Sequence, residues 1–224
     1  MNSISLEQAL ERILAAFQPL DAHDTPITEA DGLVLAQEVR APHPLPPFAN
    51  SAMDGFAVRV ADLANAREDI PIVLPVAATV QAGEVLPTAM PPATVVRIMT
   101  GACLPEGAEA VVPIEAVQEQ ADGSVAFFAP TTHGCYVRPV GEDIPAGEVA
   151  LPHGTMLKAA EVGLLAALGI TSVAVVRRPR VALFSSGDEL RTAGQPLTPG
   201  TIYDANGPAL TTFLAQQGAV PLWC

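Results

Sequence analysis

The sequence predicts a multidomain protein with both α/β and β sections, in which a barrel-like β domain is inserted between two helix-bearing segments. Three observations indicate this. Prolines crowd the stretch from Ala41 to Pro47, and the residues that follow, to about 138, form short apolar runs divided by glycine and proline. After Pro139 helix signals return, and the last part reads as strand, helix and strand.

The first segment predicts an amphipathic helix. Ser5 and Gln8 have the spacing of a capping box at its start, and Pro19 prevents it from continuing. Its apolar residues recur at the intervals that line one helical face: Leu6, Ala9, Leu10, Ile13, Leu14 and Phe17. A second, short helix is expected at Leu33–Val39, after the Asp31-Gly32 turn.

The inserted section is predicted to consist of short strands. The proline-rich stretch 41–47 forms a stiff crossing into it, because proline suits neither a helix interior nor a central strand. Asp122-Gly123 lies between two apolar runs and predicts a hairpin turn. The expected strands are Phe56–Val60, Ile72–Val80, Val95–Met99, Ala110–Ile114, Val117–Gln120 and Val125–Phe128.

The third segment returns to helix and then strand. A helix is expected at Ala159–Leu168, closed by Gly169, and a strand at Ser172–Val176. Arginines then gather around Pro179, and they form either a solvated linker or a local attraction for an anion. They are Arg177, Arg178 and Arg180.

The last section predicts the start of an α/β domain. Strands are expected at Arg180–Phe184 and Ala219–Trp223, with a helix from Pro208, as its first residue, to Gln217. Such a unit needs more strands and helices to cover a parallel sheet. We therefore expect the chain to be a truncated piece of a longer protein.

Charge and composition exclude several classes of function. The chain has 224 residues, 22 of them proline, with 11 Lys+Arg against 24 Asp+Glu, so its formal net charge is −13. Such a charge disfavours binding to nucleic acid or an anionic membrane. The three cysteines include no CxxC pair, and the N-terminus lacks the features of a signal peptide, which favours the cytoplasm. No apolar stretch approaches the roughly 20 residues of a membrane span.

Two motifs of the inserted section combine small polar residues with glycine. Asn50–Gly55 offers amide, hydroxyl and carboxylate groups in a turn, with Asp54 as the carboxylate. Arg97–Ala102 places Thr100 and backbone N–H groups, which can hold an anion, at the end of a strand. Ordinary turns without a ligand are the alternative interpretation of both.

Two further motifs pair carboxylates with a glycine. Gly141–Ile144 contains Asp143, and Gly187–Leu190 contains Asp188 and Glu189. Carboxylates suit Mg²⁺, which binds few side chains together with water and substrate phosphate. The alternative is an acidic surface turn or helix start. The later stretch Ile202–Asn206 could bring Asp204 and Asn206 to the same edge as the second pair.

Taken together, five motifs in this order closely resemble the MoeA family of molybdopterin molybdenumtransferases, which is similar to the E domain of gephyrin. The resemblance extends over essentially the whole chain and matches the N-terminal part of the family pattern. The motifs are NSAMDGFAV at Asn50–Val58, RIMTGA at Arg97–Ala102, GEDI at Gly141–Ile144, FSSGDEL at Phe184–Leu190 and IYDAN at Ile202–Asn206.

The resemblance implies a domain layout and an activity. Residues 1–47 and 139–177 would form an elongated α+β dimerisation domain, 48–138 the inserted barrel-like β domain, and 178–224 the start of a MogA-like α/β domain, left incomplete. Members of the family insert molybdate into adenylylated molybdopterin, with release of AMP and the help of Mg²⁺. The active site is shared between the two subunits of a homodimer, and other cofactor-biosynthesis proteins of the MogA type are expected partners.

The resemblance also implies site residues. The expected catalytic residues are Asp54, Thr100, Asp143 and Glu189. Those expected to bind the adenylylated pterin are Ser186, Gly187, Asp188, Asp204 and Asn206. Asp188 and Glu189 would bind the cation.

This chain departs from the family pattern in three ways. The family often has threonine where Ser186 stands, a change that keeps the hydroxyl. Several arginines commonly precede GEDI in the family, whereas here the residues are Arg138, Pro139 and Val140. The later glycine-rich and lysine motifs and the fourth domain lie outside this sequence, so we expect this chain alone to be inactive. The alternative function is a non-catalytic dimerising scaffold of the gephyrin type.

Overall fold

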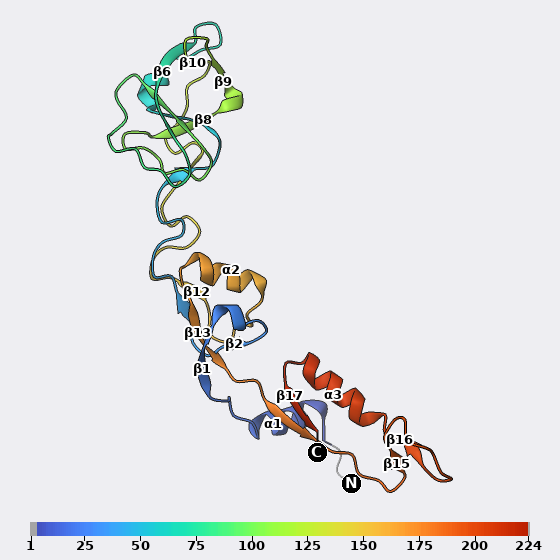
Figure 1. Cartoon of the computed structure of the whole chain (residues 1–224). Coiled ribbons are helices and arrows are strands. Elements are labelled where there is room, and N and C mark those ends of the chain that lie inside the picture. The colour runs from blue at the N-terminus through green and yellow to red at the C-terminus, as the bar shows by residue number, and fades with distance from the viewer. Residues whose placement is uncertain (1–3, 224) are drawn as a thin grey trace. The chain divides into compact units, whose positions relative to one another are not determined.

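The computed structural model describes residues 4–223 and divides into two compact units. Arg40–Ala150 forms one, called here the β unit; Met1–Val39 and Leu151–Cys224 form the other, called the terminal unit (Figure 1). The boundaries expected at 47/48 and 138/139 fall inside the β unit, and the three-domain division stays a prediction. The two units are described separately below.

The β unit is built on a six-stranded sheet that is curled into a half-barrel. Its strand order is β8-β5-β7-β6-β10-β9, and only β6 and β7 run parallel. The Asp122-Gly123 hairpin is confirmed, since β9 and β10 pair across it. The strands are β5 (Gly55–Val58), β6 (Ile72–Val80), β7 (Val95–Ile98), β8 (Ala110–Pro113), β9 (Val117–Glu119) and β10 (Ser124–Phe127).

Both faces of this sheet are packed. Along β5, Phe56 and Val58 enter one apolar cluster and Ala57 enters another, because neighbouring side chains of a strand point to opposite faces. The first cluster fills the inside of the curl, where the rings of Phe56 and Phe127 meet edge to face at 6.3 Å. Short 3₁₀ turns at Val60–Leu63 and Ile114–Ala116 follow β5 and β8.

The chain enters and leaves the sheet along paired segments. Strand β4 (Asn50–Ser51) pairs with β11 (Val137–Arg138), and β3 (Val39–Arg40) pairs with β12 (Val149–Leu151). Between them, the N–H of Leu45 donates to the carbonyl of Ile144 at 2.8 Å. The proline-rich stretch is therefore hydrogen-bonded to the returning chain.

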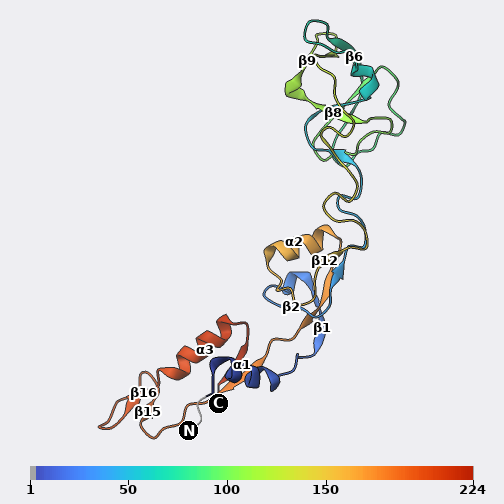
Figure 2. The ribbon, with the colours of Figure 1, turned by 180° about the vertical axis from the view of Figure 1, so that it is seen from behind.

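The terminal unit contains an antiparallel sheet of β1 (Ala22–Pro26), β13 (Ser172–Val176) and β2 (Val34–Leu35), in the order β1-β13-β2. Helix α2 (Ala159–Ala167) packs beside it, together with the 3₁₀ turn Ile27–Glu29 (Figure 2). The expected helix and its closing glycine are confirmed, with Gly169 at φ 69°. The core is formed by Ala30, Leu33, Leu35, Leu151, Leu157, Leu165, Val173 and Val175.

The prediction of a helix at Leu33–Val39 is wrong. Residues 34–35 form β2 and residues 39–40 form β3. Leu33 and Leu35 are both buried, which is the two-residue spacing of a strand, and β2 pairs with β13. The apolar run was too short to separate the helical from the strand period.

Helix α1 (Leu6–Ala15) has the expected capping box, since Ser5 and Gln8 bond reciprocally. It ends before Phe17, and none of its residues is buried among the described parts of the chain. The apolar stripe is instead exposed, with Leu6 at 81%.

The end of the terminal unit pairs β14 (Arg180–Leu183) in parallel with β17 (Val220–Trp223), and helix α3 (Asn206–Gln216) contacts both strands. Pro208 is the third helical residue and not the first as expected, because the helix begins at Asn206. The carboxylate of Asp204 accepts the N–H of Gly207 in its first turn. Short strands β15 (Leu190–Arg191) and β16 (Ile202–Tyr203) are also parallel. In residues 4–223, every helix is too short or too polar to cross a bilayer.

Candidate functional site

Asp54 and Thr100 form a hydrogen-bonded pair at one end of strands β5 and β7. The register Gly55↔Ile98 places the residue before Gly55 close to the turn after Ile98. One carboxylate oxygen of Asp54 accepts both the N–H and the hydroxyl of Thr100, each at 2.7 Å. These two donors, and more weakly the charge of Arg97, hold the pKa of Asp54 below its ordinary value. The carboxylate is exposed and anionic at neutral pH.

The polar residues that precede Asp54 hold the turn itself. Ser51 is 1% exposed, and its hydroxyl donates to the carbonyl of Met53 at 2.6 Å. The amide of Asn50 donates to the carbonyl of Phe48. The hydroxyl and amide that the motif offered to a ligand are therefore used inside the fold, and Asp54 is the group left at the surface.

Arg138 joins the carboxylates of the GEDI segment. Its Nε donates to Glu142 at 2.6 Å, and its Nη2 donates to both oxygens of Asp143 at 2.6 and 2.7 Å. The N–H groups of Gly141 and Asp143 donate to the carbonyls of Pro46 and Leu45, each at 2.9 Å. One guanidinium therefore pairs with both acidic side chains of this loop and offsets part of their charge.

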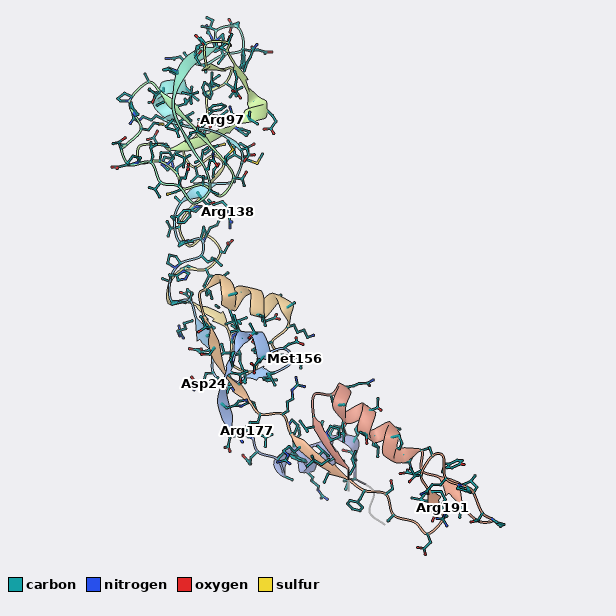
Figure 3. All side chains as sticks on the ribbon, in the orientation of Figure 1. Asp24, Arg97, Arg138, Met156, Arg177 and Arg191 are labelled. Carbon is teal, nitrogen blue, oxygen red and sulfur yellow. The ribbon has the colours of Figure 1, made fainter. Side chains whose placement is uncertain are left out.

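Strand β4 connects the two sets of groups. On one side, the carbonyl of Ser51 accepts the N–H of Gly101, next to Thr100. On the other side, Asn50 lies opposite Arg138 in the β4–β11 pair. We call this set the β-unit cluster, and Figure 3 labels Arg97 and Arg138 in it. Its members are Asp54, Arg97, Thr100, Arg138, Glu142 and Asp143.

Sequence reasoning placed Arg97 in the Arg97–Ala102 motif but gave it no role, and it did not single out its partner Glu119. Nη1 of Arg97 donates to both oxygens of Glu119, at 3.0 and 2.9 Å, and the guanidinium carbon lies 5.7 Å from the centre of the Phe56 ring. The alternation along β7 was the available signal, since Arg97 shares a face with Val95.

The glycine- and carboxylate-rich loops of the terminal unit lie together. Strand pairing joins them: the N–H of Ile202 donates to the carbonyl of Glu189 at 2.8 Å, and that of Asp204 to the carbonyl of Arg191 at 2.9 Å. The N–H of Gly207, the hydroxyl of Ser185 and the N–H of Asn206 lower the pKa of Asp204. The structure thus brings Asp204 and Asn206 beside the SSGDEL segment, as expected.

Within these loops the candidate cation-binding side chains are exposed. Asp188 and Glu189 both lie at the surface, as do Ser186 and Gly187. Arg191, which sequence reasoning did not single out, donates to the carbonyls of Asp188 and Leu190 at 3.0 and 2.7 Å and so fixes the loop backbone. A hollow of about 420 Å³ adjoins the loops, lined by Thr192, Ala193, Asp204, Pro208, Thr211 and Thr212.

The expected site residues therefore form two groups in two different units. Asp54, Thr100 and Asp143 lie in the β unit, and the remainder lie in the terminal unit. Across residues 4–223, no cluster of three or more His, Cys, Asp or Glu side chains could hold a metal by itself. A cation at Asp188 and Glu189 would need further oxygens from water or a ligand.

The half-barrel unit and the strand–helix segments around it define a MoeA-like multidomain fold. Two solved structures of the molybdopterin biosynthesis MoeA protein from Pyrococcus horikoshii share it. One has a TM-score of 0.82 at 34% identity and covers 99% of this chain and 56% of that chain. The other has a TM-score of 0.90 at 32% identity and covers 97% and 58%.

The chain belongs to the MoeA family: the model of the MoeA N-terminal region (domain I and II) matches residues 4–169. It is 42% identical over 220 residues to molybdopterin molybdenumtransferase 2 of Mycobacterium tuberculosis, covering 98% of this chain and 53% of the relative. It is 41% identical over 202 residues to the molybdopterin molybdenumtransferase of Nostoc sp., covering 89% and 46%. The chain thus spans about half the length of these relatives.

Proposed function

We propose that this chain serves a molybdopterin molybdenumtransferase, which inserts molybdate into adenylylated molybdopterin and releases AMP. The observation that carries the proposal is the Asp54–Thr100 pair on a MoeA-family half-barrel, because it presents an ionised carboxylate at the surface. The names of the similar proteins support the reaction class.

In this proposal the protein mainly positions its substrates. Asp54 and Thr100 position the molybdate. Arg138 holds the carboxylate of Asp143 in place through hydrogen bonds to both of its oxygens. Ser186, Gly187, Asp188, Asp204 and Asn206 hold the adenylylated pterin at the loops of the terminal unit. The hollow beside Asp204 gives a small polar group room to enter there.

Mg²⁺ fits the donor set of these loops. Asp188 and Glu189 supply two exposed carboxylates that form no ion pair within the described residues. Mg²⁺ usually takes one or two carboxylates, with substrate phosphate and water completing its octahedron. When bound, the ion would neutralise charge on the phosphate groups.

We further propose a homodimer that works in the cytoplasm, with MogA-like proteins as partners and residues 178–224 as the start of a MogA-like domain. Each active site would combine the β-unit cluster of one subunit with the terminal-unit loops of the other. This arrangement accounts for candidate residues that fall in two separate units.

The test is molybdate-dependent AMP release in the whole protein, with this chain and any further domains that its gene encodes. Asp54→Ala and Glu189→Ala should each slow release by about a hundredfold. Glu68→Ala, which removes an exposed carboxylate elsewhere in the β unit, should leave the rate unchanged. Equal rates of AMP release in all three variants would refute the site assignment. AMP release that does not depend on molybdate would refute the proposed reaction.

A further inference from the structure

The ion pair of Arg97 and Glu119 joins strands that are not neighbours in the sheet. Arg97 lies on β7 and Glu119 on β9, and β6 and β10 stand between them in the strand order. The pair can form only because the sheet is curled. It therefore joins two walls of the half-barrel at a partly exposed position.

The Arg97 side chain is held on two sides. It lies opposite Phe56 in the β5–β7 register, and its guanidinium carbon is 5.7 Å from the centre of that ring. Phe56 is fully buried and packs edge to face on Phe127 of β10. Together with Glu119 on β9, these contacts hold the guanidinium in place, and the Arg97 side chain is 32% exposed.

This cation and the Asp54–Thr100 pair belong to the same end of the β5–β7 strand pair. Asp54 precedes β5 and Thr100 follows β7, so both occupy the end of the strand pair where Arg97 lies opposite Phe56. Arg97 pairs with Glu119, and after the two Thr100 hydrogen bonds its positive charge also favours the ionised form of Asp54. No hydrogen bond joins Arg97 to Asp54, so its action is through charge and placement.

We propose that Arg97 is a positioning residue for Asp54, held across the half-barrel by Glu119 and Phe56. The proposal rests on the role given to Asp54 in the proposed function. Arg97 favours the ionised form of Asp54 and ties β7, whose end leads to Thr100, to Glu119 on β9. Because arginine is planar and stacks on an aromatic ring, lysine would supply the charge without the same placement.

The test is a carbon-13 NMR titration of the Asp54 carboxyl in this chain. Arg97→Gln should shift the Asp54 pKa upward, and Arg97→Lys should shift it upward by less. Arg67→Gln is the matched control, because Arg67 pairs with Asp69 at the surface of the same unit; it should leave the Asp54 pKa unchanged. An unchanged pKa in Arg97→Gln overturns the proposal. If Arg97→Gln does not fold, an unchanged Asp54 pKa in Arg97→Lys overturns the proposal instead.

A second readout separates this proposal from the proposed function. In the whole protein, Arg97→Gln should lower kcat for AMP release by about tenfold with KM unchanged, and Arg97→Lys should recover part of the loss. A fall confined to KM would overturn the positioning role. If Asp54→Ala leaves turnover intact, the proposed function of Asp54 fails, while the titration still reports whether Arg97 acts on it.

Discussion

At the residue scale, Thr100 lowers the pKa of Asp54 through two donors, of which only the hydroxyl can be removed by substitution. Thr100→Val keeps the backbone N–H and deletes the 2.7 Å hydroxyl bond. We expect the pKa of Asp54 to rise toward its ordinary value, because one of the interactions that favour the ionised form is lost. Carbon-13 NMR titration of the Asp54 carboxyl measures this directly.

The same substitution has a predictable effect on stability against pH. A lowered folded-state pKa adds stability above the ordinary aspartate pKa of about 4, and that stability is lost as the pH falls through the lower folded value. Urea unfolding should therefore show a lower free energy of unfolding for Thr100→Val than for wild type at pH 7. The two free energies should become equal in strong acid. Thr132→Val, at an exposed hydroxyl, is the control. A difference that persists in acid would contradict this linkage.

Arg138 is the second residue whose removal has a specific expected result. Arg138→Gln leaves Glu142 and Asp143 without their shared cation, so the loop should open more often. Hydrogen exchange should quicken at the amides of Gly141 and Asp143, whose bonds to Pro46 and Leu45 close the loop. The free energy of unfolding of the whole unit should change little, because solvent screens these half-exposed ion pairs. Unchanged exchange at these two amides would show that Arg138 does not hold the loop.

At the element scale, the sequence predicted most strands of the β unit because their apolar runs are bounded by glycine and proline. Periodicity failed at residues 33–39, where β2 is two residues long and exists through its pairing with β13. The site motifs could be recognised from their order along the chain. The Arg97–Glu119 ion pair could not be predicted from the sequence, because its residues are 22 positions apart and meet only through the curl of the sheet.

Glycine at position 55 is required by the close approach of two strands. A Cβ atom there would overlap the carbonyl of Val112 in β8 and lie 2.9 Å from the Cα of Pro113. Because backbone atoms cannot move aside cheaply, Gly55→Ala should lower the free energy of unfolding by more than about 2 kcal/mol. Thermal or urea unfolding measures the change.

The matched control is the same substitution in open space. Gly163 lies within α2 and has nothing within 4 Å of an added Cβ. Gly163→Ala should therefore raise the free energy of unfolding by about 0.5–1 kcal/mol, through better helix propensity. Similar effects of the two substitutions would mean that the strand approach at Gly55 is looser than the structure shows.

At the scale of the whole molecule, a chain of net charge −13 must serve two anionic substrates in the proposed reaction. The two arginines of the β-unit cluster do not resolve this, because Arg97 and Arg138 are already paired with carboxylates. Binding of an oxyanion would therefore depend on N–H and hydroxyl donors, on a cation at Asp188 and Glu189, or on an exchange of arginine partners.

The proposed sharing of active sites can be tested by mixing inactive subunits. Asp54→Ala damages the β-unit cluster, and Glu189→Ala damages the terminal-unit loops. If each site combines the two groups from different subunits, a mixed dimer keeps one intact site. An equal mixture of the two variants, after subunit exchange, should regain about a quarter of wild-type AMP release. A mixture as inactive as either variant would place both groups within one subunit.

The β unit should fold when separated from the rest of the chain, because its two ends meet. The N–H of Ala41 donates to the carbonyl of Glu148 at 2.9 Å, and the N–H of Gly147 donates to Ala41 at 2.8 Å. Two apolar clusters lie wholly within the unit. We therefore expect the segment 40–150 to unfold cooperatively in urea.

The shorter segment 48–138, the insert implied by the family resemblance, keeps both clusters but loses the closing ladder. It lacks the bonds that Leu45 makes with Asp143 and Ile144, and it lacks both carboxylate partners of Arg138. Its urea midpoint should therefore be lower than that of 40–150, while its near-ultraviolet circular dichroism should still report packed aromatic side chains. Equal midpoints would place the folding boundary at 48 and 138, because the paired segments 41–47 and 139–148 would then add nothing to the stability of the half-barrel.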